Sequence, residues 1–383
     1  MHVEVEPKNP FRLYPTPVLQ QNAFWAQVKS GQGYGVRAFD VHSDPERMRQ
    51  GCDAFVPEYN QNATHECALT DLLVVIRDLG PGSRMAYIPY GPLVEPREEE
   101  RGKYLESLSV KLREHLPPDC LFIRYDLLWE SPWAREKDYY TPDGRWIGPP
   151  DAEIRELRMN FDTDTWNLHK APGDVLPANT VYLDLTRPED ELLRRMKPKT
   201  RYNVRLSFRR GIQVWEAEPA DIRVWYELYA RTAERNRIHL DGLMYFRSVL
   251  EMTSGNRRSP ARIRLLMAGH ENEPLAGMFL AIAGGRATYL YGASSAHKRD
   301  RMPSYALQWE AIVRARRAGC TEYDMFGVSP SADPSHPMYG LYRFKTGFGG
   351  HIFHREGCWD YALDREAYAG FRARELVSRG YHV

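Results

Sequence analysis

The sequence predicts two mixed α/β domains of one architecture. With 383 residues, the chain is long for a single hydrophobic core. One order of elements occurs twice along it: a helix, three meandering strands, a second helix and a closing strand. The composition, 43% hydrophobic and 27% charged residues, is ordinary for a globular protein. We therefore expect two mixed α/β sheets, each short of a doubly wound sheet.

The first copy of this order occupies the N-terminal half of the chain. Hydrophobic periodicity and runs of β-branched and aromatic residues predict its elements. They are a helix at 24–30, strands at 34–42, 72–79 and 84–94, a helix from about 98 to 116, and a strand at 121–129.

The second copy repeats the order in the C-terminal half. The segments GHENEP and AGGR are typical of turns and separate its strands. The expected elements are a helix from about 222 to 252, strands at 261–269, 275–284 and 286–294, a helix at 305–318, and a strand at 322–328.

A polar stretch rich in Pro and Gly, residues 131–150, indicates a domain boundary near GPPDAE. After Gly347 the chain is too short to form a domain of its own. We expect that tail to dock back on one of the two domains.

The composition also limits the protein class. No stretch approaches the roughly 18 uninterrupted apolar residues of a membrane span, and MHVEVEPKNP lacks the apolar segment of a signal peptide, so we expect a cytoplasmic protein. The five cysteines are odd in number and never in CxxC, which argues against a disulfide framework or a structural zinc site. A net charge of +1 argues against a general nucleic-acid coat protein but leaves room for one basic surface.

Such a surface is indicated between Arg194 and Arg210, where eight residues are Lys or Arg and none is acidic. Thr186 and Glu189 form a capping-box pattern for one helix, which Pro198 closes. Thr200 is the expected cap of a second helix, and Gly211 its end.

On an ideal second helix Arg201, Arg205 and Arg209 stack at i, i+4 and i+8. Two apolar pairs flank them, Tyr202 with Leu206 and Val204 with Phe208, while Asn203, Ser207 and Arg210 take the opposite, wetter side. Two interpretations remain open. The arginines pair with the chain's own acids over the core, or together with Lys199 they form a ridge that binds nucleic-acid phosphates.

The order of elements is similar to that of the GNAT acyltransferase superfamily, which usually binds acetyl-CoA. There a glycine-rich loop after the last meander strand holds the pyrophosphate through backbone amides. The corresponding loop here, HKRDRMPSY, has no glycine, and Pro303 removes one amide donor. We therefore expect an acyl-transfer scaffold with a different acyl carrier, and an RNA carrier would give the basic helix a role.

Several segments resemble the FemABX family of non-ribosomal peptidyltransferases: 178–214 with its KTRYN helix, FWAQVK, YLYGAS, PSYALQWEAI and FKTGFGG. The resemblance implies two GNAT-like domains, residues 1–155 with 348–383 for precursor binding and 156–347 for the aminoacyl-tRNA. It implies transfer of an amino acid from aminoacyl-tRNA to a peptidoglycan precursor, UDP-MurNAc-pentapeptide or a lipid-linked form. The short span from Tyr245 to Arg262 resembles the FemX type, which has no helical arm.

An aminoacyl ester is already activated, so attack by an amine requires neither ATP, metal nor another cofactor. The site must supply placement, an unprotonated amine and an oxyanion donor. We expect the ammonium of Lys345 to stabilise the tetrahedral intermediate, and by resemblance Phe344 and Lys345 mark the acceptor end of the tRNA. A surface Lys in a glycine turn is the alternative.

The remaining site residues also come from the resemblance. Asp126, at the end of a strand, would orient or deprotonate the amine, and Lys29 would contact the precursor phosphate. Asp324 is equivalent to Asp126 in the second copy and is expected to be structural. The cleft between the domains would be lined by Arg235, Tyr245 and Tyr291. For each of these positions an ordinary structural role is the alternative.

Two positions depart from the family pattern. Relatives tend to carry Arg where this chain has Asp241 and Tyr90, so the nucleotide-linked acceptor is in doubt and a lipid-linked or otherwise altered precursor is favoured. Two other functions stay open: a catalytically idle module that binds RNA or precursor, and a CoA-dependent N-acyltransferase. His351, His354 and Cys358 do not predict a metal site, because a strand would point the two histidines to opposite faces.

Overall fold

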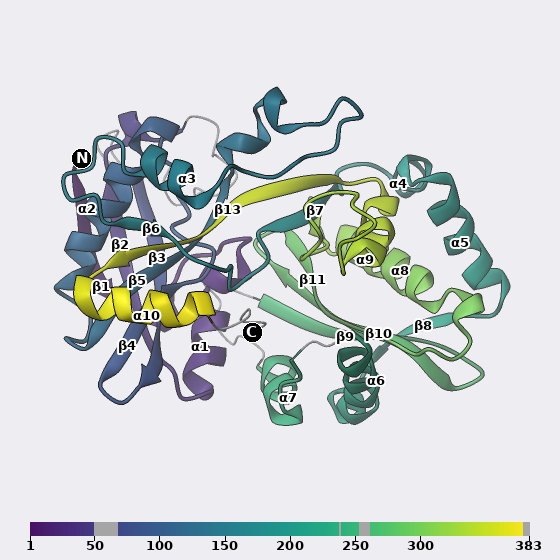
Figure 1. The fold of residues 1–383 in the computed structure, drawn as a ribbon. Coiled ribbons are helices and arrows are strands. Elements are labelled where there is room, and N and C mark those ends of the chain that lie inside the picture. Colours follow the sequence, from purple (N-terminus) through teal and green to yellow (C-terminus); the bar gives the residue numbers. More distant parts are fainter. Residues whose placement is uncertain (50–67, 237–238, 253–260, 378–383) are drawn as a thin grey trace. The chain divides into compact units, whose positions relative to one another are not determined.

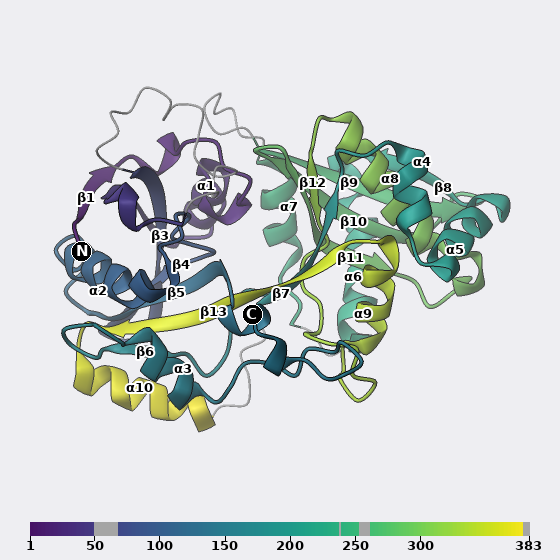
Figure 2. The same cartoon turned by 90° about the horizontal axis from the view of Figure 1, so that it is seen from above.

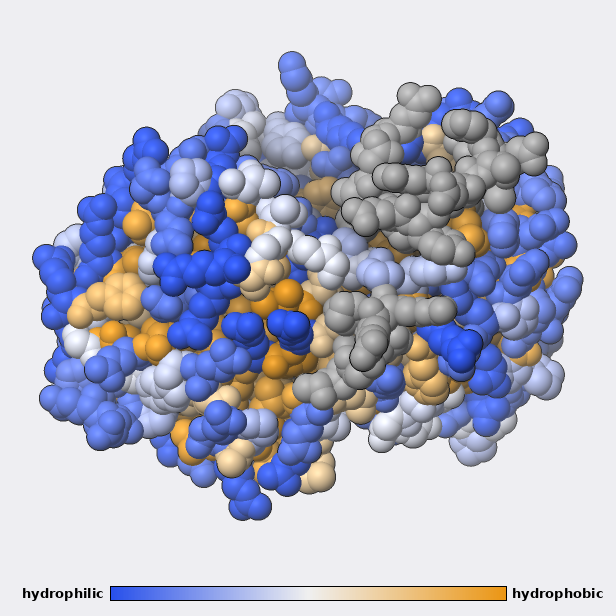
Figure 3. All heavy atoms as spheres, turned by 180° about the vertical axis from the view of Figure 1, so that it is seen from behind, coloured by the Kyte–Doolittle hydropathy of each residue, from blue (hydrophilic) through white to orange (hydrophobic). Residues whose placement is uncertain are grey.

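The structure, a computed structural model, describes residues 1–49, 68–236, 239–252 and 261–377 (Figure 1). The chain forms two compact units, unit 1 from Met1–Ala178 and His354–Val383, and unit 2 from Asn179–Phe353. Both are mixed α/β, so the predicted fold class is confirmed. Among the described residues no helix is both long and apolar enough to cross a membrane. The face drawn in Figure 3 is mainly hydrophilic.

Unit 1 contains a sheet of order β1-β2-β3-β4-β5-β13, in which, among the described strands, β4 and β5 are parallel and the other neighbours are antiparallel. Its strands are β1 (Val3–Lys8), β2 (Gly35–Ser43), β3 (Ala68–Gly80), β4 (Ser83–Ile88), β5 (Cys120–Glu130), β6 (Leu168–Lys170) and β13 (His351–Ala362). Its helices are α1 (Ala23–Gly31), α2 (Arg101–Arg113), α3 (Ala152–Met159) and α10 (Arg365–Val377).

The alternation of side chains along β3 explains the layers of unit 1. Leu72 and Val74 pack with Leu105 and Leu108 of α2 in one apolar cluster. Val75, which points to the other face, belongs to a cluster that contains Phe371 of α10. Unit 1 extends past the boundary expected near residue 155, because β6 pairs with β13 and α3 packs on β6.

Unit 2 has the matching order β8-β9-β10-β11-β12-β7, again with one parallel pair, β11–β12. Its strands are β7 (Asn179–Asp184), β8 (Gln213–Ala217), β9 (Ala261–His270), β10 (Glu273–Ala283), β11 (Arg286–Ser294) and β12 (Glu322–Asp324). Its helices are α4 (Glu189–Arg195), α5 (Pro198–Arg209), α6 (Ile222–Asn236), α7 (Leu243–Glu251), α8 (Pro303–Arg317) and α9 (Tyr339–Lys345). Helices α6 and α7 lie on one face of this sheet, and α5 and α8 on the other (Figure 1).

Three predicted elements are wrong in extent. The helix expected from 222 to 252 is two helices, because the chain is extended at Gly242 (φ −66°, ψ 152°) before α7 begins. The strand expected at 84–94 ends at Ile88, just before Pro89. The strand expected at 322–328 ends at Asp324, because Phe326 has a positive φ of 60°.

The expected helix caps around the basic run are also wrong. Pro188 precedes α4, and Thr186 instead donates its backbone N–H to Asp184 Oδ1 at 3.0 Å. Helix α5 starts at Pro198, since proline favours the first position of a helix, and Thr200 lies inside the first turn. Gly211 does follow the end of α5, with φ +78°.

The faces of α5 also differ from the prediction. Asn203 and Ser207 are buried rather than wet, together with Thr200 and Val204. This face of small side chains lets α5 approach α8 and the turn at 346–348 closely (Figure 2). The approach leaves no room at Gly347, where an added methyl group would overlap Thr200 Oγ1.

We therefore expect Gly347→Ala to destabilise the protein by about 1–3 kcal/mol, because the Thr200 side chain must rotate or α5 must shift to admit the methyl group. Thermal unfolding of the purified variants measures this loss of stability. Gly340→Ala is the matched control: it lies in α9 with nothing within 4 Å of the added carbon, and it should be neutral or slightly stabilising. Equal unfolding temperatures for the two variants would contradict the close approach.

Candidate active site

Lys345 lies at the C-terminal end of α9 and is buried, with 4% of its surface exposed. It is therefore not the surface lysine of the alternative interpretation. Its Nζ donates hydrogen bonds to Gly327 O at 2.7 Å and Phe326 O at 3.3 Å, and lies 5.2 Å from the ring centroid of Tyr289. The two carbonyls follow β12, where its parallel pairing with β11 has ended.

This environment affects both the charge and the hydrogen bonding of Lys345. Burial lowers its pKa to about 7, and the nearby carboxylate of Asp324 opposes that effect. A protonated amine has three N–H donors, and the carbonyls of Phe326 and Gly327 occupy two. In the protonated form one donor remains for a developing oxyanion.

Four further predicted residues lie in unit 2. Tyr245 of α7 and Tyr291 of β11 share a hydrogen bond of 2.5 Å between their hydroxyls. Arg235 of α6 donates to the backbone oxygen of Ser294, also on β11, at 3.2 Å. Phe344 packs edge to face against Tyr305, with ring centroids 5.1 Å apart. Strand β11 carries Tyr291, Ser294 and Tyr289, but a register shift places Tyr291 on the face of α6 and α7 and Tyr289, the neighbour of Lys345, on the opposite face.

The solvent-facing side of α5 carries exposed cations. Lys199, Arg205 and Arg209 are exposed, and none pairs with a carboxylate anywhere in the described ranges. Arg201 donates to the backbone oxygen of Arg194 at 2.9 Å rather than to an acid. Tyr202 is 55% exposed, with the guanidinium of Arg209 5.8 Å from its ring centroid. Pairing with internal acids therefore does not account for these four cations.

The start of this basic helix rests directly on the segment that carries Lys345. Lys197, just before α5, donates its backbone N–H to Gly347 O at 2.8 Å. Its Nζ also donates to Thr346 Oγ1 at 3.2 Å. The positive surface and the buried lysine therefore belong to one packed substructure of unit 2.

Asp126 on β5 of unit 1 is fully buried. Its Oδ2 accepts hydrogen bonds from the Tyr87 hydroxyl at 2.9 Å and the Leu176 N–H at 2.8 Å. Its Oδ1 is buried and has no hydrogen-bond partner among the residues that the structure describes. Burial raises the pKa of this carboxyl to about 7, and the charge of Asp174 adds to the effect. Such a group can hold or accept a proton near neutral pH.

Asp126→Asn is expected to make the protein less sensitive to alkaline pH. Because the pKa of Asp126 is about 7 in the folded chain and 3.8 in the reference state, the folded form binds more protons between these values. Wild-type stability is therefore lost as the pH rises from about 4 through 7, by at most about 4 kcal/mol. The unfolding temperature should differ less between pH 5 and pH 8 in the variant than in the wild type. An equal difference in the two proteins would contradict the raised pKa of Asp126.

Lys29 lies in the last turn of α1 in unit 1. Its Nζ donates to Gln32 Oε1 at 3.1 Å and lies 5.1 Å from the Trp25 ring centroid. Tyr90, at the place where relatives tend to carry Arg, is buried and donates its hydroxyl proton to Pro177 O at 2.9 Å. The other departure, Asp241, has its carboxylate 3.8 Å from His239 Nε2.

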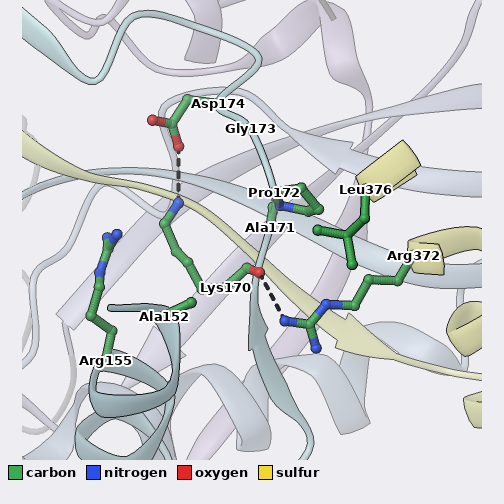
Figure 4. A pocket seen from close by; sticks show the side chains of 9 residues that line it. All are labelled: Ala152, Arg155, Lys170, Ala171, Pro172, Gly173, Asp174, Arg372 and Leu376. Carbon is green, nitrogen blue, oxygen red and sulfur yellow. Dashed lines mark hydrogen bonds and ion pairs between the residues drawn. The ribbon is translucent and has the colours of Figure 1, made fainter. Parts of the chain in front are cut away.

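A hollow of about 370 Å³ lies in unit 1 beside α3 and α10 (Figure 4). Arg155, Arg372 and Lys170 are among the residues that line it, and the Lys170 Nζ donates to Asp174 Oδ1 at 2.9 Å. None of the predicted site residues lines this hollow. Its link to the predicted site is Asp174, whose charge affects the pKa of Asp126.

The loop before α8 differs from a pyrophosphate-binding loop. Lys298 and Met302 have left-handed backbones, and Pro303 opens the helix. Lys298 Nζ and His297 Nδ1 both contact the carboxylate of Glu273, at 2.7 and 2.8 Å. An acid in this position disfavours a phosphate ligand.

Sequence reasoning missed the residues that surround Lys345: Tyr289, Phe326 and Gly327. The spacing of Tyr289 from Tyr291 in YLYGAS does not indicate it, because a β-bulge shifts the register of β11. Tyr291 pairs with Phe279 and Tyr289 with Leu280, so the two rings lie on opposite faces of the sheet. The carbonyls of Phe326 and Gly327 leave no signal, since any residue supplies a backbone oxygen. The segment expected to lack a helical arm includes residues 253–260, which lie outside the described residues.

Comparisons with known proteins show the family and the fold of the chain. The FemAB family model matches residues 13–257 and 253–375. Similar curated proteins include the lipid II:glycine glycyltransferases of Staphylococcus epidermidis, 24% identical over 251 residues, and of Staphylococcus aureus, 24% identical over 256 residues. Each match covers 51% of this chain and 60% or 61% of the relative, so the chain spans about three fifths of those proteins.

Among solved structures, the crystal structure of FemX is similar with a TM-score of 0.69 and 19% identity. The match covers 96% of this chain and 100% of that chain, so the two proteins share their fold. The family resemblance inferred from the sequence is confirmed, since the family model matches nearly the whole chain. The chain belongs to the FemAB family.

Proposed function

We propose that the chain transfers an amino acid from aminoacyl-tRNA to an amine of the stem peptide of a peptidoglycan precursor. The observation that carries the proposal is the packing of the basic helix α5 on the segment of Lys345. A helix whose exposed cations have no carboxylate partner in the described part of the chain suits the phosphates of a tRNA, and the adjacent lysine suits the ester at the end of that tRNA.

The proposed chemistry uses the residues around Lys345. The precursor amine attacks the ester carbonyl, and a C–N bond forms while the carbonyl oxygen becomes an oxyanion. The N–H of Lys345 that Phe326 and Gly327 leave unused donates to this oxyanion. Collapse of the intermediate breaks the C–O bond, and the tRNA hydroxyl leaves with the proton that the amine loses. Asp126 is our candidate to accept that proton first, because its pKa is near 7.

A lipid-linked precursor is the acceptor that we favour. The curated relatives are named lipid II:glycine glycyltransferases. In addition, Tyr90 is buried and bonded to Pro177, so it supplies no positive charge for a nucleotide phosphate. Lys29 is the proposed phosphate contact in unit 1.

A CoA-dependent N-acyltransferase is the second candidate, because the order of elements matches that scaffold. The loop before α8 argues against it, since the loop lacks glycine and places Glu273 beside Lys298. Calorimetric titration with acetyl-CoA separates the two functions. Micromolar binding would favour the coenzyme, and its absence would favour tRNA.

The direct test is incubation of the protein with a mixed pool of charged tRNAs and either lipid-linked or UDP-linked muropeptide. Mass spectrometry of the muropeptide should show one added residue, whose mass identifies the amino acid, with more product from the lipid-linked form. Binding of tRNA and precursor without any added mass would support the idle module instead.

A further inference from the structure

Asp324 was expected to be merely structural, but the structure connects it to Lys345 through a short turn. Asp324 closes β12 and is 4% exposed. Its Oδ1 accepts hydrogen bonds from the Phe326 N–H, at 2.8 Å, and from the Thr180 hydroxyl. Phe326 and the next residue, Gly327, supply the carbonyl oxygens that bind the Lys345 Nζ.

The turn needs this support because its backbone is strained. Phe326 has a φ of 60°, in the left-handed region that a large non-glycine side chain rarely adopts. A conformation of this kind persists only where neighbouring groups hold it. The hydrogen bond from the Phe326 N–H to Asp324 fixes the residue at its amide end, while its carbonyl faces Lys345.

We propose that Asp324 is a positioning residue that holds the turn from Asp324 to Gly327 in the conformation that directs two carbonyls at Lys345. Without it the turn relaxes, and the Lys345 N–H groups lose their fixed directions. This inference rests on the proposed function, since it assigns Asp324 to the placement of the oxyanion donor. A 1 Å displacement of such a group can slow a reaction by about 10²-fold.

The charge of Asp324 has a second effect that provides an independent measurement. Its carboxylate raises the pKa of Lys345 against the larger lowering by burial. Among the described residues, titratable groups near Lys345 include Tyr289, whose ring its amine contacts, and Lys197, which bonds to the neighbouring Thr346. Removal of the Asp324 charge should therefore shift the protonation of Lys345 to lower pH.

Three variants test the proposal in single-turnover aminoacyl transfer. Asp324→Ala removes the acceptor, and we expect a rate about 10²-fold lower with little change in KM. Asp324→Asn keeps an oxygen for the Phe326 N–H and should recover most of that loss. Thr180→Val, the matched control, removes only the other hydrogen bond to Asp324 and should stay within about threefold of wild type. A wild-type rate for Asp324→Ala would overturn the proposal.

A stability measurement tests, without catalysis, whether Asp324 acts on Lys345. The pKa of Lys345 is about 7 in the folded chain and 10.5 in the reference state, so the unfolded form binds more protons between these values. The unfolding free energy of a protein with Lys345, relative to its Lys345→Met counterpart, should therefore begin to rise at about pH 7 and continue to rise until about pH 10.5. In the Asp324→Asn background the onset of this rise should move to lower pH, and an unmoved onset would show that Asp324 does not act on Lys345 and would overturn the proposal. If wild type forms no amide, the proposed function fails, whereas this onset still tests the link between Asp324 and Lys345.

Discussion

Lys345→Met is expected to slow amide formation by roughly 10²–10³-fold, the usual cost of removing one oxyanion donor. The variant retains the length and apolar stem of the side chain but has no N–H to donate. Loss of the bonds to Gly327 O and Phe326 O costs about 1–3 kcal/mol of stability. Removal of a buried amine whose charge is disfavoured offsets part of this cost. We therefore expect a folded, inactive protein, as measured by single-turnover transfer and thermal unfolding.

Measurements of tRNA and precursor binding distinguish the loss of an oxyanion donor from misfolding of the variant. Lys345→Met should bind tRNA and precursor with near wild-type affinity, because the amine acts on the intermediate rather than on the ground state. Lys111→Met, an exposed position on α2, is the matched control and should leave the rate unchanged. Full activity of Lys345→Met would show that the oxyanion is stabilised elsewhere.

Replacement of Arg205 and Arg209 by Gln should weaken tRNA binding about tenfold or more at physiological salt and decrease its salt dependence. Each phosphate contact contributes about 0.7–0.9 to the slope of log affinity against log salt, so the double variant should lose up to about two contacts. Filter binding or fluorescence anisotropy between 50 and 200 mM salt measures both quantities. The physical basis is that these two guanidinium groups have no carboxylate partner among the described residues.

Arg194→Gln is the control for this experiment. Arg194 lies in the same basic run, but its guanidinium pairs with Asp190 at 2.9 Å, so its charge is already balanced locally. It should change the salt slope less than either Arg205 or Arg209. If the three substitutions change the salt slope equally, tRNA binding depends on net charge alone and α5 is not a specific binding surface.

The sequence predicted the fold well where local patterns decide it. The two copies of helix, meander, helix and strand are present, because alternation along β3 and β10 and the helical period of α2 and α8 reflect the core directly. The prediction was wrong where contacts between segments far apart in the sequence determine which residues are buried. Asn203 and Ser207 look like solvent-facing residues on a helix viewed alone, yet their small size is what lets α5 lie close to α8.

The candidate site shows the same division. Lys345 and its glycine-rich segment could be identified from residue types, since Gly347 and Gly349 indicate close backbone approach. Its burial could not, because it depends on β11 and the turn after β12, which are distant in sequence. The role of Asp324 was missed for a related reason: it acts through a strained backbone at Phe326 that no residue pattern indicates.

The path of the chain through the two sheets affects the order in which they can form during translation. Unit 2 is one continuous stretch, Asn179–Phe353, whose strands leave the ribosome one after another. The sheet of unit 1 needs β13, which pairs with β5 and is completed only after the end of unit 2. The N-terminal half therefore keeps an open edge at β5 until β13 has been synthesised.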